Sequence, residues 1–245
     1  MAFIEGRNAV LEALRARVPL RRVLIAEGTK PDGTIDEIVR RAGEAGTSVS
    51  RVPKRDLDRA SERGAHKGVM AEAAAYAFAS LDDVLARGEG KGQSLIIAMD
   101  HITDPGNFGA IVRTAEVVGA AGVLVAKRRA AAVTPAAYKS SAGALAHVAV
   151  AQETNLVRSL NRCKEAGYWV VGASEHAEQT LWEASLEGHI VLVMGSEGEG
   201  LARLTRETCD LLVRLPQAGK VGSLNVAQAT TAIAYEWLRR SAGAM

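Results

Sequence analysis

Cysteine, aromatic residues and long hydrophobic runs are all scarce in this chain of 245 residues. The two cysteines, Cys163 and Cys209, match no metal-ligand or redox spacing, so we expect buried or half-buried reduced thiols. The five histidines include no pair at i, i+4, which gives a metal site no support. No stretch approaches roughly eighteen uninterrupted apolar residues, and we therefore expect no membrane span.

The composition is that of a globular chain that can bury a core, with 48% apolar and 24% charged residues. The amino terminus, MAFIEGRNAV, carries charges where a secretory signal needs an apolar stretch, so we expect a cytoplasmic protein. The net charge of +2 alone does not indicate a nucleic-acid partner. Local clusters can follow a phosphate backbone, although ordinary solvated surface also explains them. These clusters are Arg21-Arg22, Lys54-Arg55 and Lys127-Arg128-Arg129.

Two glycine-rich loops near the end of the chain each follow a short apolar strand. The first is MGSEGEG over Met194–Gly200, and the second is QAGKVG over Gln217–Gly222. Loops at the carboxyl ends of strands commonly form the ligand pocket of an α/β fold. The first loop fits neither the dinucleotide-binding nor the P-loop glycine pattern, and Glu197 and Glu199 would repel a phosphate. We therefore expect a ligand that does not bind there through a nucleotide phosphate.

Helix and strand patterns alternate along the chain, and a glycine-and-charge run divides it. Residues 1–76 predict a compact α/β domain of three or four strands, and residues 77–92 predict a linker. Residues 93–245 predict a second α/β domain with a mostly parallel sheet and helices on both faces. The expected helices lie within residues 6–17, 31–46, 54–63, 110–120, 135–146 and 155–166, with a last helix from near residue 223. The expected strands are residues 21–26, 47–52, 67–74, 94–100, 122–126, 147–151, 168–173, 191–194 and 211–215.

Five polar residues in the second domain are candidates for chemistry, and each also has a purely structural explanation. Asn107 follows a strand and precedes a helix, where it can act as an N-cap. Arg113 on that helix is either a surface side chain or a cation facing a cleft. Glu197 is either a solvated turn residue or an acceptor for exposed amides. Ser223 is a natural N-cap, and Asn225 would fall in the first turn of the last helix.

Three long segments, in this order, resemble the motifs of the SpoU (TrmH) branch of the SPOUT RNA methyltransferases. They are DHITDPGNFGAIVRTAEVVGA, VLVMGSEGEGLARLTRETCD and LPQAGKVGSLNVAQATTAIAYEW. The front of the chain, from GRNAVLEAL to HKGVMA, resembles the substrate-binding module of the same family. Lys67 stands where the family more often has Gln. The resemblance covers nearly the whole chain.

This resemblance implies a C-terminal α/β methyltransferase domain with the SPOUT trefoil knot, preceded by a small N-terminal α/β RNA-binding domain. It implies methyl transfer from S-adenosylmethionine to a ribose 2′-hydroxyl in structured RNA, by a homodimer. In the family the matching arginine is the base or orients the hydroxyl. Because an arginine pKa of about 12.5–13.8 leaves little free base, we favour electrostatic stabilisation of the developing alkoxide. The implied catalytic residues are Arg113, Asn107, Glu197, Ser223 and Asn225, and the implied cofactor-binding residues are Gly195, Leu215 and Leu224.

The front domain is most like that of enzymes that modify a guanosine in the peptidyl-transferase region of large-subunit ribosomal RNA. We therefore expect rRNA as the substrate, while transfer-RNA guanosine and antibiotic-resistance methyltransferases share the same motifs. Binding should weaken steeply with salt, because phosphate contacts release counterions. The expected RNA contacts are Arg7, Arg21, Arg22, Lys54, Arg55 and His66.

Two other classes of protein fit the sequence less well. A non-catalytic RNA-binding or ribosome-assembly factor could keep the fold, but its sequence would show loss of the polar candidates, and all are present. A nucleotide-dependent enzyme such as a dehydrogenase needs a phosphate-binding glycine pattern and an acidic residue about twenty positions later. Neither glycine loop supplies that pattern.

Overall fold

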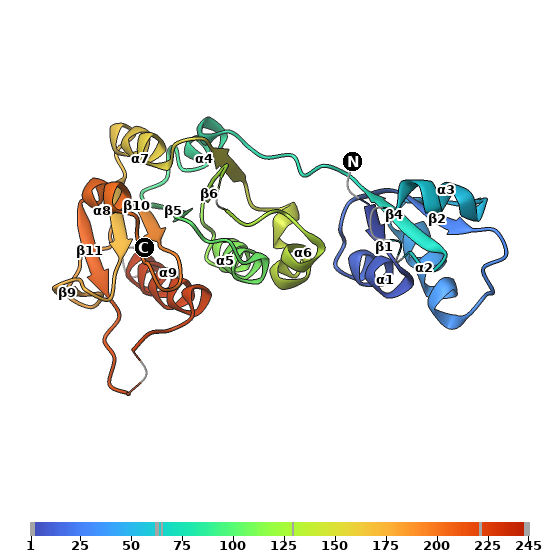
Figure 1. The fold of residues 1–245 in the computed structure, drawn as a ribbon. Helices are drawn as coiled ribbons and strands as arrows, with labels where there is room; N and C mark the ends of the chain where they lie inside the picture. The colour runs from blue at the N-terminus through green and yellow to red at the C-terminus, as the bar shows by residue number, and fades with distance from the viewer. Residues whose placement is uncertain (1–2, 62–63, 65, 129, 221, 243–245) are drawn as a thin grey trace. The chain divides into compact units, whose positions relative to one another are not determined.

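The chain forms two units in this computed structural model (Figure 1). One unit comprises Met1–Ala77 with Val133–Lys139, and the other comprises Phe78–Ala132 with Ser140–Met245. The structure describes residues 3–61, 64, 66–128, 130–220 and 222–242.

The first unit is a small α/β fold on a four-stranded sheet. Its elements are β1 (Phe3–Glu5), α1 (Arg7–Arg15), β2 (Leu20–Ala26), α2 (Gly33–Glu44), β3 (Ser48–Val52), α3 (Lys54–Ala60) and β4 (Val69–Ala73). The strand order is β1-β4-β2-β3, with β2 and β3 parallel and β4 antiparallel to both of its neighbours. Leu57 of α3 is buried together with Leu24 of β2 and Met70 of β4. A compact α/β domain of three or four strands was expected here, and the structure shows one with four.

The second unit is built on a seven-stranded sheet in the order β7-β6-β5-β10-β8-β11-β9. Its strands are β5 (Ser94–Met99), β6 (Gly122–Ala126), β7 (Val150–Glu153), β8 (Trp169–Ala173), β9 (Gln179–Thr180), β10 (His189–Met194) and β11 (Leu211–Arg214). All of the pairings between these strands are parallel. The carboxyl ends of all seven strands therefore meet at one edge of the sheet, as the sequence predicted for a mostly parallel sheet.

Helices cover both faces of this sheet, as expected (Figure 1). They are α4 (Leu81–Ala86), α5 (Pro105–Val117), α7 (Leu156–Glu165), α8 (Arg203–Thr208) and α9 (Val226–Ala242), and α6 (Pro135–Ser141) lies across the division between the units. Leu81 of α4 and Leu160 of α7 are buried against Ile96 and Val191 of the sheet. α5 and α9 pack on one another against the other face. The core thus holds the strand ends rigidly beneath their loops.

Several local features differ from the sequence prediction, and the short helix α8 was not predicted at all. The segment predicted as a linker, residues 77–92, contains α4, which begins with a capping box formed by Ser80 and Asp83. The helix expected over residues 135–146 ends at Ser141, because Ala142 and Gly143 adopt left-handed conformations with φ of 49° and 94°, and a 3₁₀ turn follows. The short strands β1 and β9 carried no recognisable sequence signal.

The two cysteines are free thiols, as expected. Cys163 is buried and Cys209 is half-buried. Burial raises the pKa of both thiols to about 12. Both side chains are therefore protonated at neutral pH and serve as packing residues.

Candidate active site

A cavity of about 550 Å³ opens at the carboxyl edge of the seven-stranded sheet. The loops after β8, β10 and β11 and the start of α9 line it. Gly195, Leu215 and Leu224, the residues predicted to bind a cofactor, all lie in its wall. Its size is in the range of small-molecule sites.

Three polar residues from separate segments meet beside this cavity. Asn225 Nδ2 donates hydrogen bonds to Glu197 Oε1 at 2.7 Å and to Asn107 Oδ1 at 2.9 Å. Asn107 Nδ2 donates to the same Glu197 Oε1 at 3.1 Å. Each residue belongs to a different one of the three sequence motifs, so the fold brings the motifs into one hydrogen-bonded cluster. We call Asn107, Glu197 and Asn225 the amide–carboxylate cluster.

The start of α5 fixes Asn107 in this cluster, although not as the sequence suggested. Asp104 is the N-cap, and its Oδ2 accepts a hydrogen bond from the backbone N–H of Asn107 at 2.7 Å. Pro105 is the first helical residue, a position where its missing N–H costs nothing. The prediction of Asn107 as the N-cap is therefore wrong. Its side chain is released from the backbone and binds Glu197 instead.

The start of α9 places Asn225 in a similar way. The helix begins at Val226, and Asn225 Oδ1 accepts a hydrogen bond from the backbone N–H of Ala227 at 2.9 Å. Asn225 therefore does the capping that the sequence assigned to Ser223. Ser223 is exposed and lines the cavity two residues earlier. One Asn225 side chain thus caps the helix through its oxygen and binds the cluster through its nitrogen.

The spacing of the glycines in MGSEGEG follows from a tight loop. The backbones of Ser196 and Gly200 bond to each other in both directions, at 3.0 Å each. A Cβ on Gly195 would lie 2.2 Å from the carbonyl carbon of Gly200, so no larger residue fits there. Gly198 and Gly200 have φ values of 96° and 68°, a region that favours glycine. The loop turns so sharply that Glu197 faces Asn107 and Asn225.

A buried aspartate that the sequence analysis did not single out supports this loop. Asp100, at the end of β5, is only 2% exposed. Its Oδ2 accepts a hydrogen bond from the backbone N–H of Ala202 at 2.7 Å, and its Oδ1 lies 2.5 Å from Nδ1 of His101. His101 has a φ of 59°, an uncommon value for a residue with a side chain. Asp100, in the first motif, is therefore hydrogen-bonded to Ala202, in the second.

We expect Asp100→Ala to lower the free energy of unfolding by about 1–3 kcal/mol, because the Ala202 N–H loses its acceptor in a buried setting. Asp100→Asn keeps an acceptor oxygen and should lose less. Urea unfolding of the two variants and the parent measures both changes. A fully stable alanine variant would contradict this role for Asp100.

Arg113 lies apart from the amide–carboxylate cluster. It is on α5, six residues after Asn107, or about 9 Å along the helix axis. The side chain is exposed, makes no hydrogen bond or ion pair with another described residue, and does not line the cavity. Thr114 Oγ1 bonds to Thr231 Oγ1 at 2.8 Å, which fixes α5 against α9 at this level. Arg113 is thus a free cation on a rigid helix.

Most of the predicted RNA contacts in the first unit have acidic partners. Arg7 pairs with Asp32, and Lys54 Nζ lies 3.1 Å from Asp58. Arg21 and Arg22 both pair with Glu72, at 3.6 and 2.8 Å. The side chains of Arg21, Arg22 and Lys54 nevertheless remain at least half exposed, so they keep N–H groups that can reach a ligand.

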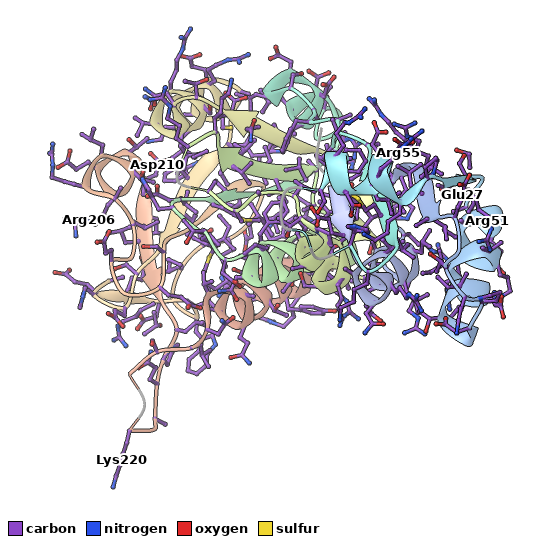
Figure 2. All side chains as sticks on the ribbon, turned by 45° about the vertical axis from the view of Figure 1, so that its right-hand side comes forward. Glu27, Arg51, Arg55, Arg206, Asp210 and Lys220 are labelled. Atoms are coloured by element: carbon purple, nitrogen blue, oxygen red, sulfur yellow. The ribbon has the colours of Figure 1, made fainter. Side chains whose placement is uncertain are left out.

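His66 and Arg55 differ from these four residues. His66 is buried, and its Nδ1 accepts a hydrogen bond from the backbone N–H of Gly68 at 3.1 Å. Its Nε2 therefore carries the proton and donates to Asp58 Oδ1 at 2.8 Å. This hydrogen bond holds the pKa of Asp58 below its ordinary value, and the bond from Lys54 adds to the effect. Arg55 is exposed, points outward in Figure 2, and has no partner among the described residues.

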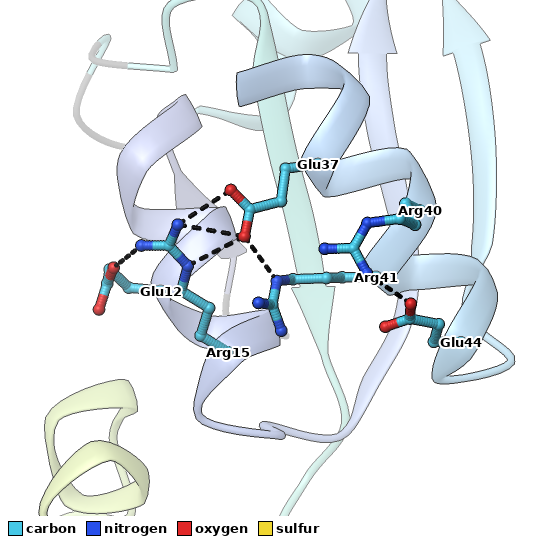
Figure 3. Close-up of polar contacts among 6 residues, drawn as sticks. All are labelled: Glu12, Arg15, Glu37, Arg40, Arg41 and Glu44. Carbon is cyan, nitrogen blue, oxygen red and sulfur yellow. Dashed lines mark hydrogen bonds and ion pairs between the residues drawn. The ribbon is translucent and has the colours of Figure 1, made fainter. Parts of the chain in front are cut away.

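On the outer side of α1 and α2, the charges of arginines and glutamates neutralise one another (Figure 3). Arg15 pairs with Glu12 and Glu37, each at 2.9 Å. Glu37 also pairs with Arg41, and Arg40 pairs with Glu44 along α2. The arginines here neutralise glutamates of the same unit. This surface is therefore a weaker anion site than its arginine content suggests.

The described residues show two further absences. No group of three or more His, Cys, Asp and Glu side chains among them is placed to hold a metal ion. None of their helices combines the length and the hydropathy of a membrane-crossing segment.

Comparison with known families agrees with this geometry. Residues 94–235 match the SpoU rRNA methylase family, and residues 3–79 match the RNA 2′-O ribose methyltransferase substrate-binding family. The chain therefore belongs to the SpoU (TrmH) family of RNA 2′-O-ribose methyltransferases, and it is an enzyme of this class.

Relatives and solved structures extend over nearly the whole chain. A tRNA/rRNA methyltransferase of Mycolicibacterium smegmatis, itself uncharacterized, is 43% identical over 97% of this chain and 76% of its own length. A Bacillus subtilis protein assigned to the TrmH family of tRNA/rRNA methyltransferases is 40% identical over 97% of this chain and 95% of its own. The SpoU methyltransferase AviRb from Streptomyces viridochromogenes, solved with AdoMet, aligns with a TM-score of 0.69 and 28% identity. That alignment covers 98% of this chain and 90% of AviRb.

Proposed function

We propose that this protein methylates the 2′-hydroxyl of a guanosine in large-subunit ribosomal RNA, with S-adenosylmethionine as the methyl donor. The observation that carries the proposal is the amide–carboxylate cluster, in which all three family motifs meet beside a ligand-sized cavity. AviRb, which was crystallised with AdoMet, supports the choice of cofactor.

The cavity suits this cofactor chemically. Glu175, Glu197 and Glu199 in its wall favour a cation such as a sulfonium and disfavour a phosphate. Arg206 and Arg214 in the same wall offer the opposite charge for a carboxylate. We assign Gly195, Leu215 and Leu224 as cofactor contacts, since the absence of a Cβ at Gly195 leaves backbone accessible and the two leucines supply apolar surface.

The remaining residues act on the ribose. When bound, the cofactor supplies a methyl group on a sulfonium, whose S–C bond breaks as the ribose oxygen forms an O–C bond and loses its proton. Arg113 stabilises the negative charge that develops on this oxygen, and a substrate phosphate or water takes the proton. Asn107, Glu197 and Asn225 hold the ribose in line with the methyl group, and Ser223 lines the approach.

The first unit selects the RNA. It matches the substrate-binding family, and its exposed basic side chains fit a phosphate backbone. We assign Arg55, which has no partner among the residues that the structure describes, together with Arg7, Arg21, Arg22 and Lys54 as RNA contacts. His66 supports them by holding Asp58 in place. Transfer RNA is the second candidate substrate, because the relatives are named as tRNA/rRNA methyltransferases.

The resemblance of the chain to the SpoU (TrmH) family supports three further parts of the proposal. The C-terminal segment passes through a loop to form a trefoil knot, two chains form a homodimer, and the protein acts in the cytoplasm on RNA during ribosomal RNA processing.

Methyl transfer from labelled S-adenosylmethionine tests the substrate. We expect label in a 2′-O-methylguanosine of undermodified large-subunit rRNA, mapped by nuclease digestion, and none in bulk transfer RNA. Label in transfer RNA would keep the chemistry and replace the substrate. Absence of label in both RNAs, with cofactor bound, would contradict the proposed function.

A further inference from the structure

The loop after β6 carries two adjacent cations that the proposed mechanism does not use. Lys127 and Arg128 are exposed, and neither side chain has a hydrogen-bond or ion-pair partner among the described residues. They belong to a basic cluster of the sequence whose third member, Arg129, lies outside the described residues.

This loop is fixed beside the first motif. The backbone N–H of Ala131 donates to the carbonyl oxygen of Ile102 at 2.8 Å, and that of Lys127 donates to the carbonyl oxygen of Glu153 at 2.8 Å. Ser140 Oγ donates to the carbonyl oxygen of Pro105 at 3.3 Å, just before Asn107. The two cations therefore stand on a loop held at both ends, next to the strand that leads to the amide–carboxylate cluster.

The strand order separates the charges along this edge of the sheet. The cavity takes its wall from the loops after β10, β8 and β11, and those after β10 and β8 carry Glu197, Glu199 and Glu175. β5 leads to Asn107 in the middle, and β6 lies one strand further, about 5 Å away in the opposite direction. On the cavity side the three carboxylates outnumber Arg206 and Arg214. On the other side, the loop after β6 offers a polyanion the two cations Lys127 and Arg128.

We infer that Lys127 and Arg128 bind backbone phosphates of the substrate RNA next to the nucleotide that is methylated. This inference rests on the proposed function, because it takes the substrate to be RNA. A phosphate on this side leaves the cofactor cavity free and brings the ribose to the cluster from the side opposite the methyl donor. Two adjacent cations on a fixed loop bind a phosphate backbone without reading its bases.

RNA binding by a double variant tests the inference. We expect Lys127→Ala with Arg128→Ala to weaken binding of a transcript of the large-subunit peptidyl-transferase region about tenfold or more. The slope of log affinity against log salt should fall by roughly 1.4–1.8, since each lost phosphate contact removes about 0.7–0.9. Cofactor binding, measured by calorimetry, should stay unchanged. Unchanged RNA affinity and salt slope would overturn the inference.

Two further variants complete the test. Arg87→Ala with Lys91→Ala removes the same charge at the opposite edge of the sheet, before β5, and should keep RNA affinity within twofold. An equal loss in this control would overturn the inference. Lys127→Arg with Arg128→Lys keeps both charges and should bind RNA like the parent, while unchanged cofactor binding by the double alanine variant excludes a folding defect there. RNA binding is measured without methyl transfer. If the parent protein binds the RNA transcript but transfers no labelled methyl group to it, that result contradicts the proposed substrate and leaves the binding inference standing.

Discussion

Replacement of Arg113 by alanine is expected to reduce methyl transfer about 10²–10³-fold or more while S-adenosylmethionine binds within a few fold of the parent. The loss of rate follows from the proposed role of Arg113 in stabilising the developing alkoxide, because one removed donor of this kind costs about that much. Cofactor binding should persist because Arg113 is not in the cavity wall. Single-turnover kinetics and calorimetry measure the two effects separately.

The structure also predicts that this variant folds normally. Arg113 is exposed and makes no bond to another described residue, so the free energy of unfolding should change by less than about 0.5 kcal/mol. Arg113→Lys keeps the charge but loses the planar fork, and we expect intermediate activity. Arg158→Ala removes an exposed arginine from α7 and should leave turnover intact. An alanine variant of Arg113 with near-full activity would refute the assignment.

The sequence was enough to predict that the three motifs meet at one edge of the sheet. Apolar strands followed by helices predict a parallel sheet, and in such a sheet all loops at the carboxyl ends share one edge. Asn107, Glu197 and Asn225 each follow such a strand, and the structure joins them through hydrogen bonds of 2.7–3.1 Å. The element order and the sheet therefore followed from spacing and hydrophobic pattern.

The exact role of each polar residue was harder to predict from the sequence, because neighbouring residues compete for it. Asp104 and Asn107 are both good N-caps, three residues apart, and each would give a plausible helix start. The Asp-Pro pair decides between them, because proline fits the first helical position best. That signal was present in the sequence. It frees Asn107 for the cluster, and Asn225 at the start of α9 shows the same competition with Ser223.

The surface charge of the first unit shows a different limit. Arg21 and Arg22 form a basic doublet in the sequence, yet both pair with Glu72 some fifty residues later. The contact exists because β2 pairs with β4 in a register that places Arg22 opposite Glu72. Strand register depends on packing of the whole sheet, so the sequence alone shows the doublet and not its partner.

Replacement of Glu197 by alanine is expected to lower kcat/KM about 10²-fold or more. Its Oε1 accepts from both Asn107 and Asn225 and lies 3.4 Å from the backbone nitrogen of Val226. Without it, two side-chain amides lose their common acceptor, and a shift of about 1 Å in such groups can cost that much. Because the cluster is largely exposed, the free energy of unfolding should fall by no more than about 1 kcal/mol. Steady-state kinetics and urea unfolding measure the two quantities.

Matched variants separate positioning from charge. Glu197→Gln keeps an oxygen that can accept both amides and should retain activity within about tenfold. Glu199→Ala removes a carboxylate of the same loop that bonds to neither amide, and it should lower kcat/KM far less than Glu197→Ala. Adding Asn225→Ala to Glu197→Ala should cost little more than the first change, because residues that share one network are not additive. If Glu199→Ala were as harmful as Glu197→Ala, loop charge rather than the amide–carboxylate cluster would govern the reaction.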